Sequence, residues 1–280
     1  MSTRNWNVLC WNIRGINGNK KWDAVRDKIN ESGCSIVCLQ ETKRENFDTP
    51  FIRQFIPKRL DKYEFVPSIG ASGGILVAWN SNLFSGQVLD SRQFSITLEF
   101  TSTLSLQKWK LTTVYGPCTD PLRSQFILWL RNHVILDEDN WLFLGDFNFY
   151  RSLNDRNKPE GNLQDTLIFN DVIGHLGLIE LPIKDRSFTW SNMQHDPLLE
   201  QLDWFFTSGN WTFCYPNTLV LPLAKLTSDH IPCKVVISTA IPKANIFIFE
   251  NFGQEHPGFF DVVQKGWKKT SEIKEILPPF

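Results

Sequence analysis

Four motifs, spread along the chain, place a polar side chain at the end of a short apolar run. Runs of this kind are typical of buried β-strands, and the ends of neighbouring strands meet at one edge of a sheet. The pattern therefore predicts a sheet protein in which distant polar residues converge on one site. The motifs are Leu9-Cys10-Trp11-Asn12, Val37-Cys38-Leu39-Gln40-Glu41, Phe143-Leu144-Gly145-Asp146-Phe147-Asn148 and Ser228-Asp229-His230-Ile231-Pro232.

The polar residues of these motifs are amides, carboxylates and one histidine. Carboxylate and carboxamide oxygens suit a hard divalent cation, and such an ion makes a bound water nucleophilic. Phosphoester hydrolysis is slow enough that one acid–base residue, worth about 10²–10⁴-fold, does not suffice. The combination therefore predicts a metal-dependent phosphoester hydrolase.

Helical and strand patterns alternate along residues 1–240, which we expect to form one domain. The mixture predicts an α/β fold, a four-layered α/β sandwich with two mixed β-sheets packed face to face and helices outside. Residues 48–61 fit either a short helix or a loop. Residues 241–280, where the core pattern lapses, are predicted to be a C-terminal appendage with a short helix at 259–267. The other predicted helices are 20–32, 121–134 and 165–176, and the predicted strands are 6–13, 36–39, 64–67, 74–79, 86–89, 94–100, 109–115, 141–144, 188–190, 202–206, 218–221 and 233–237.

The six cysteines form no Cys-x-x-Cys pair, and Cys10, Cys38 and Cys233 lie within apolar runs. We expect reduced core thiols, without a zinc site or a disulfide-linked partner. The first residues lead directly into a strand, and no apolar run reaches the length of a membrane span. The sequence therefore predicts an intracellular monomer without membrane contact, with the nucleus favoured over the cytoplasm. The net charge of −1 indicates that any nucleic-acid contact is local.

One apparent motif is rejected. Residues 70–74, Gly-Ala-Ser-Gly-Gly, match the Gly-x-Ser-x-Gly pattern of serine hydrolases. That motif requires a strand before it and a helix after it. Here a β-like run follows, so a hairpin turn is predicted.

The complete set of motifs, in this order across residues 5–240, resembles the endonuclease/exonuclease/phosphatase superfamily. The resemblance is to the apurinic-endonuclease-like domain of plant non-LTR (LINE-type) retrotransposons. Each motif is weak alone, whereas the ordered set is specific. The further matching stretches are Ser72-Gly73-Gly74-Ile75, Val114-Tyr115-Gly116-Pro117, Ser187-Phe188-Thr189-Trp190-Ser191-Asn192 and Leu202-Asp203.

The resemblance implies roles for nine residues. Glu41, Asn12 and Asp229 would hold or orient Mg²⁺, with Mn²⁺ as an alternative ion. Asp146 would activate the attacking water, and Asn148 would donate to the phosphate. His230, held by Asp203, would stabilise the developing charge, and the Tyr115 hydroxyl would donate to phosphate. Thr189 would contact the DNA backbone. For Arg14 a DNA-backbone contact is predicted from the arginine itself, as described next, and not from the resemblance.

Asp146 and Asn148 are two residues apart, and we expect an extended segment that points both side chains to one face. Two features depart from the family pattern. Arg14 stands where abasic-site endonucleases carry an aspartate that supports the metal; it could bind phosphate in a bidentate manner, and abasic-site activity is doubtful. Gln201 and Trp204 replace arginines expected on either side of Leu202-Asp203.

The sequence thus predicts a Mg²⁺-dependent, retrotransposon-derived endonuclease that nicks DNA and leaves a 3′-hydroxyl. By analogy, that end would prime reverse transcription, although no reverse transcriptase follows in this chain. Two alternatives stay open: a phosphatase of the same superfamily acting on a small phosphorylated molecule or phosphoinositide, and a catalytically inactive retrotransposon remnant that still binds DNA or protein.

Overall fold

The computed structural model describes residues 5–70, 72–159, 161–225 and 227–238, together with Asp261 and Gln264. The chain divides into two compact units, residues 1–241 and 242–280, and only the first is discussed below. The predicted appendage and its short helix lie outside the described residues except for Asp261 and Gln264. That part stays a prediction.

The first sheet has six strands and carries the N-terminal motifs. Its β1 and β2 are parallel because α1 (Asn19–Ser32) connects them as a crossover, and its other pairs are antiparallel. It is therefore a mixed sheet. In spatial order the strands are β13 (Leu219–Pro222), β14 (Cys233–Ser238), β1 (Asn5–Asn12), β2 (Ile36–Gln40), β4 (Ser72–Trp79) and β3 (Lys62–Ile69).

The second sheet also has six strands and is mixed, with β7 and β8 parallel. Helix α3 (Leu122–Arg131) lies on the connection between these two strands. In spatial order the strands are β5 (Phe84–Arg92), β6 (Ser95–Ser102), β7 (Lys108–Tyr115), β8 (Trp141–Asp146), β12 (Asp203–Thr207) and β9 (Ile179–Glu180). A separate two-stranded hairpin pairs β10 (Trp190–Ser191) with β11 (Leu199–Glu200).

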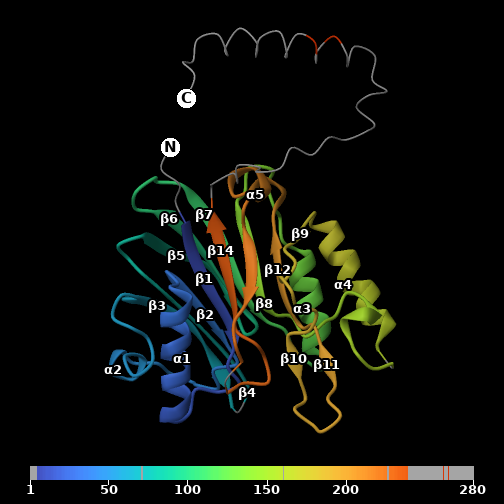
Figure 1. The fold of residues 1–280 in the computed structure, drawn as a ribbon, viewed down its shortest axis with the longest axis horizontal. Helices are drawn as coiled ribbons and strands as arrows, with labels where there is room; N and C mark the ends of the chain where they lie inside the picture. Colours follow the sequence, from blue (N-terminus) through green and yellow to red (C-terminus); the bar gives the residue numbers. More distant parts are fainter. Residues whose placement is uncertain are drawn as a thin grey trace, which may run out of the picture. The chain divides into compact units, whose positions relative to one another are not determined.

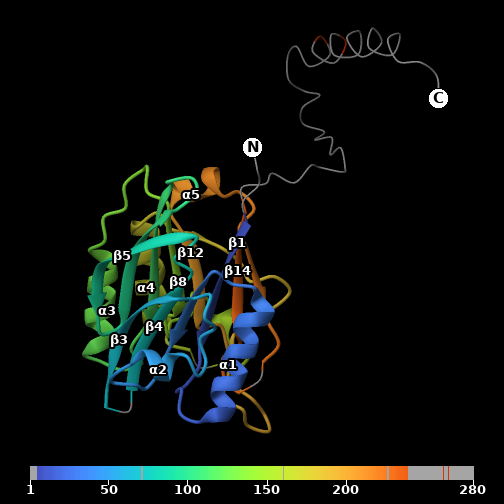
Figure 2. The same cartoon turned by 90° about the vertical axis from the view of Figure 1, so that its left-hand side faces the viewer.

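The two sheets pack against each other, and helices cover their outer faces (Figure 1, Figure 2). Helices α1 and α2 (Thr49–Ile52) cover the first sheet, while α3 and α4 (Leu163–His175) cover the second. The other helices described within residues 5–238 are the 3₁₀ turn Leu153–Asp155 and α5 (Gly209–Cys214). This arrangement confirms the predicted four-layered sandwich.

A buried aromatic and aliphatic core separates the sheets. It combines inward side chains of β1, β2 and β4 with those of β6, β7 and β8, for example Val8, Val77, Leu98 and Leu142. Strands buried on both faces lose the polar–apolar alternation of exposed strands, which explains the continuous apolar runs in the sequence. The core therefore fixes the relative position of the strand ends that carry the site.

The predicted elements agree with the structure except at short or irregular segments. Residues 48–61 contain the single-turn α2, and the predicted strand 188–190 is reduced to Trp190–Ser191. The sequence did not predict strands β9 and β11 or helix α5. Ser72, Gly73 and Gly74 of the Gly-x-Ser-x-Gly match begin β4, which pairs antiparallel with β3, so this stretch belongs to a hairpin, as predicted. No helix among the described residues is long and apolar enough to cross a bilayer.

Candidate active site

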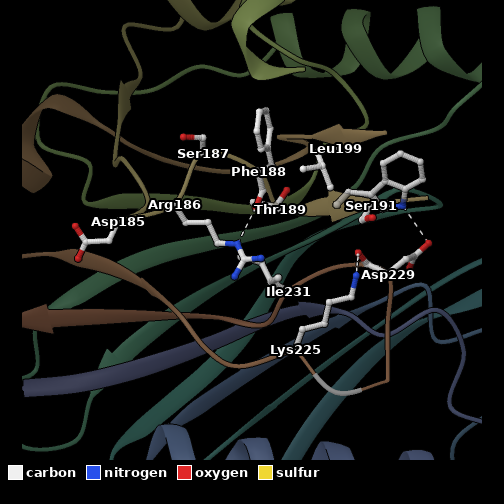
Figure 3. A pocket seen from close by; sticks show the side chains of 11 residues that line it. Asp185, Arg186, Ser187, Phe188, Thr189, Ser191, Leu199, Lys225, Asp229 and Ile231 are labelled. Atoms are coloured by element: carbon white, nitrogen blue, oxygen red, sulfur yellow. Dashed lines mark hydrogen bonds between the residues drawn. The ribbon is translucent and has the colours of Figure 1, made fainter. Parts of the chain in front are cut away.

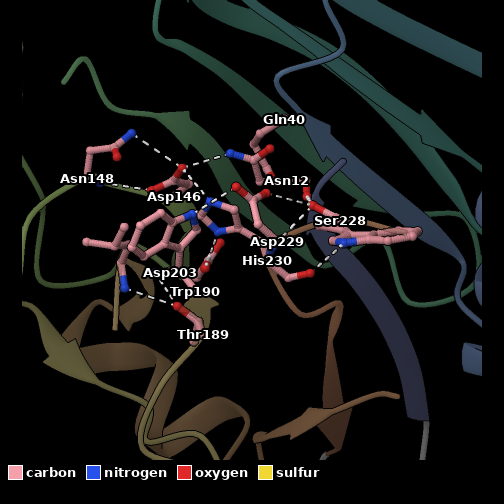
Figure 4. Close-up of polar contacts among 12 residues, drawn as sticks. Asn12, Gln40, Asp146, Asn148, Thr189, Trp190, Asp203, Ser228, Asp229 and His230 are labelled. Carbon is pink, nitrogen blue, oxygen red and sulfur yellow. Dashed lines mark hydrogen bonds and ion pairs between the residues drawn. The ribbon is translucent and has the colours of Figure 1, made fainter. Parts of the chain in front are cut away.

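The ends of strands from both sheets bring the predicted site residues together (Figure 4). Asn12 ends β1, Tyr115 ends β7 and Asp146 ends β8. Asp203 begins β12, which runs antiparallel to β8, so Asp203 is the direct cross-strand partner of Asp146. His230 precedes β14, which runs antiparallel to β1. Strands β1, β7 and β8 end at this edge of the molecule. Strands β12 and β14 run in the opposite direction, so they begin at the same edge.

Asp146, His230 and Asp203 form the buried centre of the site. Their side chains are at most 5 % exposed. His230 Nδ1 lies 2.8 Å from Asp203 Oδ2, and His230 Nε2 lies 3.5 Å from Asp146 Oδ2. The Asn12 amide nitrogen donates to Asp146 Oδ2 at 2.8 Å. Because Asp203 binds one ring nitrogen, the other is directed toward Asp146.

The protonation of this centre follows from burial and mutual charge. Burial raises the pKa of Asp146 above that of an exposed aspartate, although the charge of His230 opposes the shift. Burial alone would lower the pKa of His230, but Asp203 and Asp146 outweigh it and raise the pKa to about 9. His230 is therefore a cation at neutral pH, and Asp146 is a stronger base than an ordinary aspartate.

Asn148 joins the centre by a different backbone path from the one predicted. Its φ is 55°, so the segment is not extended after Asp146, and the alternation argument was wrong. The left-handed turn lets Asn148 N donate to Asp146 Oδ1 at 3.0 Å. The side-chain amide donates to Gly116 O at 2.7 Å and to Asp146 Oδ2 at 3.3 Å. Asn148 and Asp146 thus converge through a local turn that asparagine tolerates.

Tyr115 links this centre to Glu41. Its hydroxyl hydrogen-bonds the Glu41 carboxylate, and burial together with the charges of Glu41 and Asp146 raises the pKa of Tyr115. The Tyr115 residue is directly paired with Asp146 across β7 and β8. Glu41 also pairs with Lys43, whose Nζ lies 2.9 Å from Glu41 Oε1. Tyr115 is therefore positioned between the carboxylate of the first sheet and that of the second.

Glu41 and Asn12 supply oxygen donors that suit Mg²⁺. The ends of β1 and β2 are adjacent, since Asn12 is registered with Gln40 and Gly15 N donates to Glu41 O at 2.6 Å. Within the described residues, no group of three or more His, Cys, Asp or Glu side chains forms a complete metal cage. Mg²⁺ commonly takes only one or two carboxylates and completes its shell with water and phosphate. The donor set fits an ion of that kind.

Asp229 is engaged by neighbours within the chain. The Arg14 guanidinium forms an ion pair with Asp229 Oδ2, and Trp190 Nε1 donates to the same oxygen at 3.0 Å. Burial opposes ionisation, but His230, Trp190 and Arg14 together lower the pKa of Asp229. Metal ligation by Asp229 and phosphate binding by Arg14 stay predictions, and the structure shows these two residues paired with each other.

Thr189 lies beneath the site and is 1 % exposed. Its hydroxyl accepts hydrogen bonds from Leu202 N at 3.0 Å and Asp203 N at 3.1 Å. It therefore positions the start of β12 and with it Asp203. Its predicted contact with DNA has no support in this placement and stays a prediction. Trp204, where an arginine was expected, is a buried residue whose Nε1 donates to Phe149 O at 2.7 Å.

Sequence reasoning assigned no role to three residues that organise the site. Ser228 Oγ donates to Asn12 O at 2.7 Å and ties the His230 loop to β1. Trp190 binds Asp229, as described above. Arg123 of α3 donates to Asn148 O at 2.7 Å and to Pro117 O at 3.2 Å. Ser228 and Trp190 stand inside quoted motifs and could have been found, whereas nothing in the sequence marks Arg123.

A surface cavity of about 330 Å³ borders the site beside Asp229 (Figure 3). Arg186 and Lys225 lie at this cavity, together with the aromatic rings of Phe188 and Trp190. Lys225 Nζ donates to the Asp229 carbonyl oxygen at 2.9 Å. The cavity thus combines cations with apolar walls and opens directly next to the candidate catalytic residues.

Comparisons with known proteins agree with this architecture. Residues 9–230 match the endonuclease/exonuclease/phosphatase family. The chain is 25 % identical over 169 residues to the transposon TX1 uncharacterized 149 kDa protein of Xenopus laevis, covering 57 % of this chain and 13 % of that protein. The chain therefore spans about an eighth of the length of this curated relative.

Two solved structures share the fold. One is the AP endonuclease LMAP from Leishmania major, with a TM-score of 0.64 and 15 % identity, covering 84 % of this chain and 88 % of that one. The other is the endonuclease domain of TRAS1, a telomere-specific non-LTR retrotransposon, with a TM-score of 0.62 and 12 % identity, covering 84 % and 98 %. At such identities the likeness shows the fold alone.

Proposed function

The chain belongs to the endonuclease/exonuclease/phosphatase family, and from this premise we propose that it is a divalent-metal-dependent endonuclease that nicks DNA and leaves a 3′-hydroxyl. The observation that carries the proposal is the buried group of Asp146, His230 and Asp203, joined within 3.5 Å and bound by the Asn12 amide nitrogen at 2.8 Å. The end of β1 that carries Asn12 lies beside the end of β2, which Glu41 follows. Such a group combines a base, a cation and a metal-binding edge, which phosphodiester hydrolysis requires together.

In this proposal Asp146 takes the proton from the attacking water. The amides of Asn12 and Asn148 both donate to Asp146 Oδ2, at 2.8 and 3.3 Å, so the carboxylate is held in one orientation. Burial raises the pKa of Asp146, which favours proton transfer near neutral pH. The position of the base is therefore set before substrate arrives.

His230 stabilises the charge that develops on the phosphate oxygens. Its raised pKa keeps the ring cationic, and Asp203 at 2.8 Å fixes its orientation. Tyr115 adds a hydroxyl donor beside Asp146. A divalent ion, Mg²⁺ or Mn²⁺, held by Glu41 and Asn12 would supply further positive charge to the phosphate. Together these groups would bind the pentacoordinate phosphoryl group and neutralise the negative charge on its oxygens.

The resemblance to retrotransposon endonucleases supports DNA as the substrate. TX1 is named as a transposon protein, and TRAS1 is named as a non-LTR retrotransposon endonuclease. We propose that the nick made by this chain primes reverse transcription of an element's RNA, in the nucleus.

Nicking of supercoiled plasmid tests this function. We expect wild-type protein to convert the plasmid to open circles with Mg²⁺, and EDTA to stop the reaction. DNA polymerase should extend the nicks without prior end repair, since a 3′-hydroxyl is the end that it requires. Parallel incubation with phosphoinositides should release no phosphate. Phosphoinositide hydrolysis without plasmid nicking would replace the proposal by the phosphatase alternative.

A further inference from the structure

Three cations from separate parts of the chain converge on the segment 227–229. Lys21 Nζ of α1 donates to Thr227 O at 2.9 Å, and Arg14, after β1, pairs with Asp229 Oδ2. Lys225 Nζ donates to Asp229 O at 2.9 Å. Arg14, Lys21 and Lys225 are called the cation group below. Oxygen atoms of one short segment therefore hold three positive charges beside the catalytic centre.

The carboxylate of Asp229 is occupied by donors of this chain. Oδ2 accepts from Arg14 and Trp190. Ser228 Oγ lies 3.3 Å from Oδ1, but its one proton is donated to Asn12 O at 2.7 Å. The side chain is only 6 % exposed. A buried carboxylate whose Oδ2 accepts from two donors orients those donors, and a metal bound at that oxygen would displace the Arg14 ion pair. The arrangement suits an anchor for Arg14 better than a metal ligand.

The cation group holds more positive charge than its neighbours neutralise. Burial lowers the pKa of Lys21, and Arg14 and Lys43 lower it further against the opposing carboxylates of Asp229 and Glu41. Glu41 is itself paired with Lys43. The Arg14 side chain is 57 % exposed, so its remaining N–H groups face solvent. An anion placed there would relieve mutual repulsion among the cations.

We propose that Asp229 is a positioning residue that holds the cation group as a subsite for a DNA backbone phosphate next to the one that is cleaved, and that it does not ligate the metal. The substrate class rests on the proposed function. The cavity of about 330 Å³ on the Lys225 side, with Arg186 and the Phe188 ring, offers space for the adjoining nucleotide (Figure 3). A backbone phosphate is the anion that reaches this place whenever a strand crosses the catalytic centre.

Binding of a fluorescein-labelled duplex oligonucleotide in EDTA tests the subsite. We expect Arg14→Ala and Lys21→Ala each to weaken binding about fivefold to tenfold and to lower the salt slope by about 0.9, the value for one phosphate contact. Lys20→Ala is the matched control. Lys20 is the exposed neighbour of Lys21, and its substitution removes the same charge. An equal loss in Lys20→Ala and Lys21→Ala would overturn the subsite.

Mn²⁺ binding, followed by electron paramagnetic resonance without DNA, tests the role of Asp229. The double variant Arg14→Ala/Asp229→Asn keeps the net charge of the site, and we expect its Mn²⁺ affinity to stay within about twofold of wild type. Glu41→Gln should weaken Mn²⁺ at least about tenfold. If the double variant loses affinity as Glu41→Gln does, Asp229 is a ligand and the inference is wrong.

These readouts are independent of cleavage. A wild-type protein that nicks no plasmid, but shows the expected difference between Lys20 and Lys21, would refute the proposed function and retain the phosphate subsite. Nicking activity with equal duplex affinity in all three single variants would retain the function and refute the subsite.

Discussion

The two sides of the site are built in different ways. Asp146 and Asp203 stand on paired strands of the second sheet, and with His230 they form a hydrogen-bonded group at most 5 % exposed. Arg14, Glu41 and Lys43 stand on loops, with φ values of 50°, 52° and 54°, and their side chains are 57 %, 15 % and 30 % exposed. Left-handed backbone at non-glycine residues is strained and concentrates at functional sites.

The difference indicates that the buried side and the loop side have different roles. The buried side is complete without any ligand, because its charges satisfy one another within the fold. The loop side carries partly exposed charges, and in the proposed function these bind a metal or a phosphate. The first side should respond to substitution through catalysis and stability, whereas the second should respond through affinity for ions and DNA.

The largest expected effect is on the buried side. His230→Ala should lower the plasmid-nicking rate about 10³-fold, because the cation facing the phosphate is lost and Asp203 remains without its partner. His175→Ala, an exposed histidine at the end of α4, should nick at the wild-type rate. Circular dichroism should show that both variants are folded. A rate within tenfold of wild type for His230→Ala would remove the distinction between the two sides.

Gly145, which precedes Asp146 on β8, should tolerate no side chain. Gly145 has a φ of 137°, and a Cβ there would lie 2.1 Å from Val114 O. Gly145→Ala should therefore cost about 3 kcal/mol of unfolding free energy, measured by urea denaturation. Gly174→Ala on α4 is the control, since its Cβ would meet nothing within 4 Å and should stabilise by up to about 1 kcal/mol. Similar stabilities in the two variants would contradict a tightly built buried side.

Stability should depend on pH through His230. Its folded pKa, about 9, lies above the unfolded value near 6.5, so its contribution is fully present below pH 6.5 and is lost as pH rises through 9. In EDTA, the wild type should lose about 2 kcal/mol across that window, and ionisation of buried Asp146 acts in the same direction at lower pH. His230→Gln should show a flatter curve. If His230→Gln shows the same dependence of unfolding free energy on pH as the wild type, another group is responsible for the titration.

A smaller effect is expected where the buried side is braced from outside. Arg123 binds Asn148 O and Pro117 O and pairs with Asp165 at 2.9 Å. Arg123→Ala should lower the nicking rate about tenfold, because the left-handed turn at Asn148 loses its support. Arg131→Ala on the same helix, where Arg131 pairs with Asp171 at 2.6 Å on the surface, should leave the rate unchanged. Equal nicking rates in the two variants would show that the turn at Asn148 does not depend on Arg123.

The sequence contained more information about the buried side than about the loop side. Asp146 and His230 follow from motifs at strand ends, where the fold forces convergence. The Asn148 turn was missed because residue spacing alone cannot distinguish an extended segment from a left-handed one. The pairing of Arg14 with Asp229 joins residues 215 positions apart through loop paths, which no local pattern encodes. The two-residue strands β9 and β11 are too short to show a periodicity.

Single-turnover plasmid cleavage by wild type and Asp146→Asn at saturating Mg²⁺ tests the central claim most directly. The substitution keeps the shape of the side chain and removes the base. We expect the wild type to produce nicked circles and Asp146→Asn to be slower by about 10³-fold or more with unchanged duplex affinity. A wild type that leaves the plasmid supercoiled at every Mg²⁺ concentration, or an Asp146→Asn variant that nicks at the wild-type rate, would contradict the account.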